Sequence, residues 1–175
     1  MHHVILGLLL TGLIALYDVQ KRFAAGLAHF YSSSSGSIER ALRTLVTEGH
    51  ATIHDDPGSA RRRRVYRITP SGRAAWRAWM QSPTPAGADA ETTALAKVFL
   101  LGRLEDAGEQ AAVLAGIRAE AEGARVRLSD LAATLDAQAA ELDDEVRSVY
   151  APQRATLDYG LRAHDTLIAW IREQE

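Results

Sequence analysis

The feature that most constrains the fold is a change of hydrophobic period at Gly49. Within residues 36–49 the apolar side chains recur every three or four positions, which is the spacing of one helix face. Residues 51–54 and 65–69 instead alternate between polar and apolar side chains, and the sequence DDPG at positions 55–58 is a strong turn signal between them. The sequence therefore predicts a helix followed directly by a β-hairpin with a long tip.

Further helical segments flank this unit on both sides. Residues 4–16 are almost entirely apolar, and residues 18–30 carry an apolar face with Asp18 as a plausible N-cap. Thr69 is the expected N-cap of a fourth helix, with Pro70 as its first residue. The order helix, helix, helix, two-stranded wing is that of a winged helix-turn-helix. In such a fold the third helix enters the major groove of DNA and the hairpin tip reaches along the backbone.

The apolar run 4–16 also resembles the core of a signal peptide. It is 13 residues long, whereas a helix needs about 17 to 25 residues to span a bilayer. No small-residue cleavage pattern follows it directly. We therefore expect a buried helix of a soluble, cytoplasmic protein that has no membrane partner.

Charge is divided unequally along the chain. Residues 1–80 carry 11 Lys and Arg against 5 Asp and Glu, a net charge of +6, whereas residues 81–175 carry 9 against 17, a net charge of −8. Because Lys and Arg attract phosphate and carboxylates repel it, the N-terminal half is the candidate nucleic-acid binder, with double-stranded DNA as its partner. The most basic stretch lies in the tip of the predicted hairpin.

Candidate DNA contacts lie at the start and on the solvent face of the third helix, on the second helix and in the hairpin tip. Serine hydroxyls and N–H groups at a helix start can hold a phosphate, and arginines opposite the apolar stripe can face base edges or the DNA backbone. The tip arginines and one lysine supply counterion release. The predicted DNA-binding residues are Lys21, Ser33, Ser34, Ser35, Ser37, Arg40, Arg43, Arg61, Arg62, Arg63 and Arg64.

A stretch containing Ser, Pro and Gly interrupts the pattern after the fourth helix. The predicted organisation is a winged helix-turn-helix domain at 1–82, a linker at 83–89 and a helical dimerisation domain at 90–175. The fold class is therefore mostly α, with long, coiled-coil-like helices in the C-terminal part.

Two narrow apolar seams with heptad spacing mark this C-terminal part, one in a long helix and one after Pro152. One small chain cannot cover both seams well, so a second copy is the expected partner and the protein a homodimer. The predicted dimerisation residues are Leu114, Ile117, Leu128, Leu131, Leu135, Leu157, Leu161, His164, Ile168 and Ile171.

Several function classes find no support in the sequence. The chain has no cysteine, which excludes disulfides, thiolate catalysis, zinc ribbons and iron–sulfur clusters. It has no phosphate-binding glycine loop and no G-x-S-x-G or H-E-x-x-H motif, so we expect neither an enzyme nor a bound cofactor or metal. The alternative is an interaction protein whose winged helix recruits a protein partner and whose helical tail dimerises. Trp76 and Trp79 are interpreted as packing residues, with an aromatic ligand cage as the alternative.

Four short motifs also carry a family resemblance. They are ILGLL at 5–9, YDVQKRF at 17–23, the glycine-bounded helix at 36–49 and RVYRITPSGR at 64–73. In combination they resemble the signature of the PadR family of bacterial transcriptional regulators. The C-terminal part resembles the helical dimerisation domain of the virulence-activator-like subfamily, through Leu100, Leu157-xx-Gly160-Leu161 and Trp170-Ile171.

The resemblance implies a cytoplasmic homodimer that binds a pseudo-palindromic operator and usually represses, with release by a small-molecule effector in some members. It aligns Ser33, Ser34, Gly36 and Ser37 with the start of the recognition helix, and Arg61 to Arg64 with the basic wing. The chain departs from the family at two places: many members have Tyr-Pro where this chain has Glu39-Arg40, and glycine where it has Leu16. Glu39 would repel phosphate unless it accepts a hydrogen bond from a cytosine amine, so base readout is not carried over.

Overall fold

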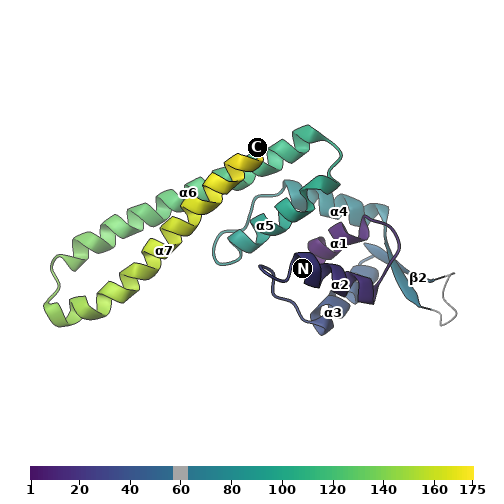
Figure 1. Cartoon of the computed structure of the whole chain (residues 1–175), viewed down its shortest axis with the longest axis horizontal. Helices are drawn as coiled ribbons and strands as arrows, with labels where there is room; N and C mark the ends of the chain where they lie inside the picture. The colour runs from purple at the N-terminus through teal and green to yellow at the C-terminus, as the bar shows by residue number, and fades with distance from the viewer. Residues whose placement is uncertain (57–62) are drawn as a thin grey trace. The chain divides into compact units, whose positions relative to one another are not determined.

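A computed structural model describes residues 1–56 and 63–175 of the chain. The chain forms two compact units, Met1–Val113 and Leu114–Glu175. The mostly helical fold class with a small wing sheet is confirmed (Figure 1). The elements are α1 (His2–Leu9), β1 (Ile14–Ala15), α2 (Leu16–Gly26), α3 (Ser35–Thr47), β2 (Ala51–Asp55), β3 (Arg64–Ile68), α4 (Pro70–Gln81), α5 (Ala90–Leu100), the 3-10 helix η1 (Leu101–Arg103), α6 (Ala107–Ala139) and α7 (Asp144–Gln174).

The sheet has three antiparallel strands in the order β1-β3-β2, one more than predicted. The β2–β3 hairpin is confirmed, with Ala51 opposite Ile68 and Asp55 opposite Arg64. The additional strand, β1, comes from the segment predicted as the end of the first helix: Ala15 lies opposite Val65.

The prediction of one helix over residues 4–16 is therefore wrong beyond Leu9. The hydroxyl of Thr11 donates to the carbonyl of Leu8 at 3.0 Å, closing the end of the helix. Gly12 then adopts a φ of 117°, which a residue with a side chain rarely does. The chain reverses there and leads into β1.

The second helix begins earlier than predicted. Ala15, with an extended backbone, is the N-cap of α2, so Asp18 lies in the first helical turn and is not the cap. The predicted apolar face is confirmed at Val19, Phe23 and Leu27, which are buried, but the helix ends at Gly26 and not at Phe30 as predicted. The apolar stripe of α3 and its end before Gly49, which has a φ of 75°, are confirmed as well.

The core of the first unit forms around α1, which is buried on nearly all sides. A β-carbon on Gly7 would lie 2.6 Å from Leu100 of α5 and 2.8 Å from Trp76 of α4, so both helices pack directly against α1. The sequence assigned α5 to the C-terminal domain, yet by its packing it belongs with the N-terminal unit. Its side chains Ala94 and Leu100 are each only 1% exposed.

Helix α4 begins as predicted, with Pro70 as its first residue and the hydroxyl of Thr69 accepting from the Gly72 N–H at 3.1 Å. Trp79 stacks on the ring of His3 with centroids 5.4 Å apart. The ammonium of Lys97 lies 5.6 Å from the centroid of Trp79. Trp79 thus contacts side chains of the chain itself, as a packing residue does.

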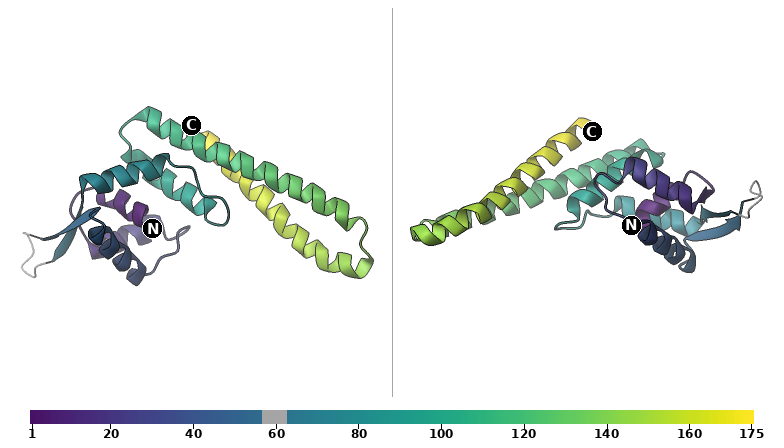
Figure 2. Two further views of the ribbon diagram at one scale, coloured as in Figure 1. Left: turned by 180° about the vertical axis from the view of Figure 1, so that it is seen from behind. Right: turned by 60° about the horizontal axis from the view of Figure 1, so that its bottom comes forward.

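In the second unit, α6 and α7 run antiparallel and lie side by side (Figure 2). Helix α7 starts before Pro152, where Asp143 caps it by accepting from the Val146 N–H at 2.8 Å. The helix then continues through Pro152. A β-carbon on Gly160 of α7 would lie 3.5 Å from Leu128 of α6, so the two seams meet within one chain.

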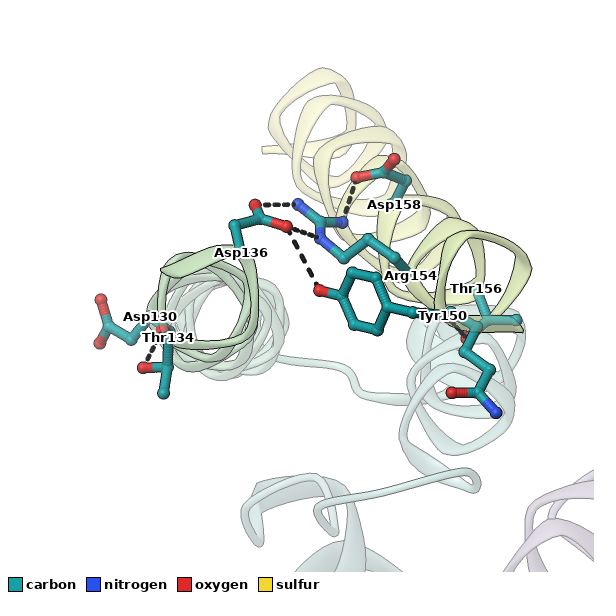
Figure 3. Close-up of polar contacts among 8 residues, drawn as sticks. Asp130, Thr134, Asp136, Tyr150, Arg154, Thr156 and Asp158 are labelled. Carbon is teal, nitrogen blue, oxygen red and sulfur yellow. Dashed lines mark hydrogen bonds and ion pairs between the residues drawn. The ribbon is translucent and has the colours of Figure 1, made fainter. Parts of the chain in front are cut away.

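Ion pairs link α6 and α7 along their length. Figure 3 shows one end, where the guanidinium of Arg154 donates to both oxygens of Asp136 at 2.8 and 2.9 Å and to Asp158 at 2.6 Å. The other links are Arg125–Asp165, Arg172–Glu122 and Arg118–Glu175. Among the described residues, no helix is long and apolar enough to cross a membrane.

Candidate nucleic-acid interface

The start of α3 is held by a capping box formed by two of the predicted phosphate-binding serines. The Ser34 hydroxyl accepts from the Ser37 N–H at 3.1 Å, and the Ser37 hydroxyl accepts from the Ser34 N–H at 2.9 Å. The Ser37 hydroxyl also donates to the Ser34 carbonyl at 2.7 Å. Both hydroxyls therefore already satisfy the helix start, which fixes the orientation of α3 relative to the preceding turn.

The other two predicted serines are differently placed. Ser35 is exposed as the first residue of α3, and Ser33 is half-buried just before the cap. Neither hydroxyl makes a hydrogen bond within the part of the chain that the structure describes. These two side chains are the ones available to an incoming phosphate.

The solvent face of α3 carries the two predicted arginines in different states. Arg43 forms an ion pair with Glu39 one turn earlier, and this hydrogen bond raises the pKa of Arg43. Arg40 is exposed and makes no ion pair with any described residue. The hydroxyls of Thr44 and Thr47 donate back to the carbonyls of Arg40 and Arg43, both at 3.1 Å, so they belong to the helix itself. Arg40 is thus the cation that α3 presents without an internal partner.

At the base of the wing, the structure describes two of the four predicted arginines, since Arg61 and Arg62 lie outside the described residues. Arg64 is exposed at the start of β3, opposite Asp55. The guanidinium of Arg63 donates to Asp18 of α2 at 2.6 Å.

Helix α2 adds one more predicted cation. Lys21 is exposed. Its neighbour Arg22 donates to the hydroxyl of Thr11, in the turn before β1, and so ties α2 to that turn. Within the described residues, no group of three or more His, Asp or Glu side chains is placed to hold a metal ion.

Sequence reasoning missed the carboxylate partners of two candidate arginines. Glu39 and Arg43 are separated by four positions on a helix, and that spacing could have revealed the pair. Asp18 and Arg63 are 45 positions apart. Their contact depends on the pairing of β1 with β3, for which the sequence showed no local signal.

The predicted dimerisation residues differ in how far one chain already covers them. Leu114, Ile117, Ile168 and Ile171 are at most 6% exposed within the single chain, whereas Leu131 is 47% exposed. The remaining five are half-buried: Leu128, Leu135, Leu157, Leu161 and His164. Their contact with a second copy stays a prediction.

Three helices, a strand between the first two, and a cationic hairpin before a fourth helix define a winged-helix protein. Residues 5–78 match the sequence model of the transcriptional regulator PadR-like family, the family that the motifs of the chain resemble. The matched segment ends before the C-terminal helices, and placement in the virulence-activator-like subfamily stays a prediction.

Solved structures of such regulators resemble the chain over nearly its whole length. PadR of Bacillus subtilis in complex with operator DNA is 20% identical, with 98% of this chain and 94% of that chain covered and a TM-score of 0.45. The same protein with p-coumaric acid is 21% identical, with 98% and 94% covered and a TM-score of 0.44. The PadR-like regulator BC1756 of Bacillus cereus is 22% identical, with 99% and 94% covered and a TM-score of 0.41. No curated protein matches the chain.

Proposed function

We propose that this protein is a sequence-specific DNA-binding transcriptional regulator, a repressor that acts as a homodimer on a pseudo-palindromic operator. The observation that carries the proposal is the capped helix α3, which presents the exposed Arg40 within the segment that matches a family of transcriptional regulators. The family match supports a non-enzymatic, cytoplasmic role. Release by a small-molecule effector follows from the family resemblance.

The division of labour follows from the positions of the cations. Arg40 lies on the solvent face of α3, the helix that enters the major groove in a winged helix, so it is assigned to base edges. Arg63 and Arg64 at the base of the wing, together with Lys21, are assigned to the phosphate backbone. Phosphate contacts supply affinity that depends on salt, and base contacts supply sequence preference.

The test of DNA binding uses a fluorescent duplex of random sequence. At low salt the protein should bind it in the micromolar range, and affinity should fall by about 10³ to 10⁵ between about 50 and 200 mM salt if a dimer neutralises about 6 to 10 phosphates. Absence of binding at low salt would contradict the proposal and favour the protein-interaction alternative. Footprinting on the DNA upstream of the protein's own coding region would then locate an operator.

The second copy is proposed to cover large apolar side chains that one chain leaves exposed on α6 and α7. Leu131 on α6 is 47% exposed, and Val149 on α7 is 60% exposed. Sedimentation equilibrium should report a dimer for the wild type and a shift towards monomer for Leu131→Arg. Ser129→Arg adds the same charge two positions away on another face of α6 and should remain dimeric. Equal behaviour of the two variants would contradict this placement of the dimer surface.

A further inference from the structure

One predicted DNA contact is already paired with a carboxylate of the chain itself. The pair between Arg63 and Asp18 exists because Ala15 of β1 lies opposite Val65 of β3. Helix α2 begins at the residue after β1, so its first turn lies beside the residue that precedes β3. The sheet register thus brings an α2 carboxylate to the base of the wing.

Both partners are held at this position. Asp18 lies in the first turn of α2, where the partial positive charge of the helix start favours a carboxylate. The backbone of Arg63 is fixed across the hairpin, because its carbonyl accepts from the Asp56 N–H at 2.7 Å. The side chains of Arg63 and Asp18 are 44% and 43% exposed, so a DNA phosphate can reach the same guanidinium.

We propose that Asp18 is an intramolecular competitor of DNA phosphate for Arg63. This inference rests on the proposed DNA-binding function. A carboxylate oxygen and a phosphate oxygen are alternative acceptors for the same guanidinium N–H groups. While Asp18 holds Arg63, the wing base offers one cation fewer to the DNA backbone.

The consequence is weaker binding to every duplex, whatever its sequence. Asp18 lowers the sequence-independent part of the affinity, which competes with operator binding, and leaves the base contacts of α3 unchanged. The Glu39–Arg43 pair does not carry the same argument, because its members lie one turn apart on α3, where such a pair supports the helix itself.

The experiment measures binding of a random-sequence duplex to the full-length protein by fluorescence anisotropy. Asp18→Asn should bind more tightly than the wild type at about 50 mM salt, with a slope of log K against log salt steeper by about 1.8, the value for two additional phosphates, one at each wing of the dimer. That slope makes the gain shrink about 12-fold between about 50 and 200 mM salt. In an Arg63→Ala background, Asp18→Asn should have no effect.

Glu105→Gln serves as the matched control, because it changes the net charge equally in the segment between η1 and α6. It should leave both affinity and slope unchanged. Thermal unfolding verifies that each variant is folded, and Asp18→Ser, which keeps a polar side chain in the first turn, replaces Asp18→Asn if that variant does not fold.

Three outcomes would overturn the inference: unchanged or weaker binding by a folded Asp18 variant, a gain that persists without Arg63, or an equal gain in Glu105→Gln. If the wild type itself does not bind the random duplex at about 50 mM salt, the proposed function fails. If the wild type binds and the Asp18 variants bind equally, only the competitor role fails.

Discussion

Gly72 in the first turn of α4 lies against the backbone carbonyl of His50, so closely that a β-carbon at position 72 would come within 2.1 Å of the carbonyl oxygen. The same oxygen accepts from the Thr69 N–H at 3.0 Å. Because His50 directly precedes β2, this contact joins the start of α4 to the first strand of the wing hairpin. The absence of a side chain at position 72 is thus a packing requirement.

Gly72→Ala should therefore destabilise the protein, by about 1 to 3 kcal/mol as for other overpacked sites. Urea unfolding followed by circular dichroism measures the change. Gly116→Ala in α6 is the control: a β-carbon added there would meet nothing within 4 Å, so the substitution should stabilise by up to about 1 kcal/mol. A Gly72→Ala variant as stable as the wild type would show that α4 can shift at no cost.

The serines at the start of α3 should separate into a capping and a binding class. Ser34→Ala removes the cap and should cost about 0.5 to 2 kcal/mol of stability. Ser35→Ala leaves the capping box intact, so the unfolding free energy should stay nearly unchanged. It removes a hydroxyl that is available to phosphate, so it should weaken duplex binding. Unfolding curves and anisotropy titrations on the same two variants check this. Loss of stability in Ser35→Ala would contradict the separation.

The arginines of α3 and the wing should differ in what they control. Arg62→Ala combined with Arg63→Ala should weaken binding to all sequences alike and flatten the salt dependence, because phosphate contacts are sequence-independent. Arg40→Ala should also reduce the difference in binding affinity between operator and random duplex, because Arg40 is assigned to base edges. Anisotropy titrations at several salt concentrations measure both effects, and an unchanged salt slope in the wing double variant would refute the first half.

Lys97 should make stability depend on alkaline pH. Its side chain is 1% exposed, and burial lowers the pKa of its ammonium below the ordinary 10.5. Between the lowered pKa of the folded state and 10.5, the unfolded chain binds more protons than the folded chain. The free energy of unfolding of the wild type should therefore rise with pH relative to that of Lys97→Met. Urea unfolding of both proteins at about pH 7 and about pH 10 tests this. The half-buried Tyr31, whose pKa is raised, acts in the opposite direction but is common to both proteins. A difference in stability that stays constant with pH would contradict the expectation.

Arg154 should make the α6–α7 pair sensitive to acid. Its hydrogen bonds lower the pKa of Asp136, so the stabilisation is present at neutral pH and is lost as pH falls below the ordinary value of 3.8 and through the lowered pKa. Arg154→Met should have a lower unfolding temperature than the wild type at neutral pH. On acidification its unfolding temperature should fall less than that of the wild type. Arg162→Met, on the same helix and with no ion pair among the described residues, is the control and should behave like the wild type. Equal acid sensitivity in all three proteins would contradict this role for Arg154.

Signals within a few residues were enough to predict the elements whose start or end is marked by a cap or by a change in the spacing of apolar residues. Gly49 after α3 and the Thr69-Pro70 start of α4 were recognised because their chemistry acts within a few residues. β1 was missed because a two-residue strand is stabilised by its partner β3, about fifty positions away, rather than by its own pattern.

Contacts between residues far apart in the sequence also explain why the placement of α5 and the partner of Arg63 were not predicted. Helix α5 was predicted as part of the C-terminal domain, but its Leu100 packs on Gly7, which lies near the start of the sequence. The heptad seams were recognised from their spacing, which does not reveal whether the covering helix belongs to the same chain. Arg63 was recognised by its charge, whereas its partner Asp18 depends on the register of the sheet.

The short strand β1 also determines how the sheet meets other molecules. With β3 in the centre, the two outer strands are β1, which has two residues, and β2, which has five and carries Asp55 at its end. Short or charged outer strands are poor templates for the addition of a foreign strand. The wing is thereby protected against the edge-to-edge aggregation to which small exposed sheets are prone.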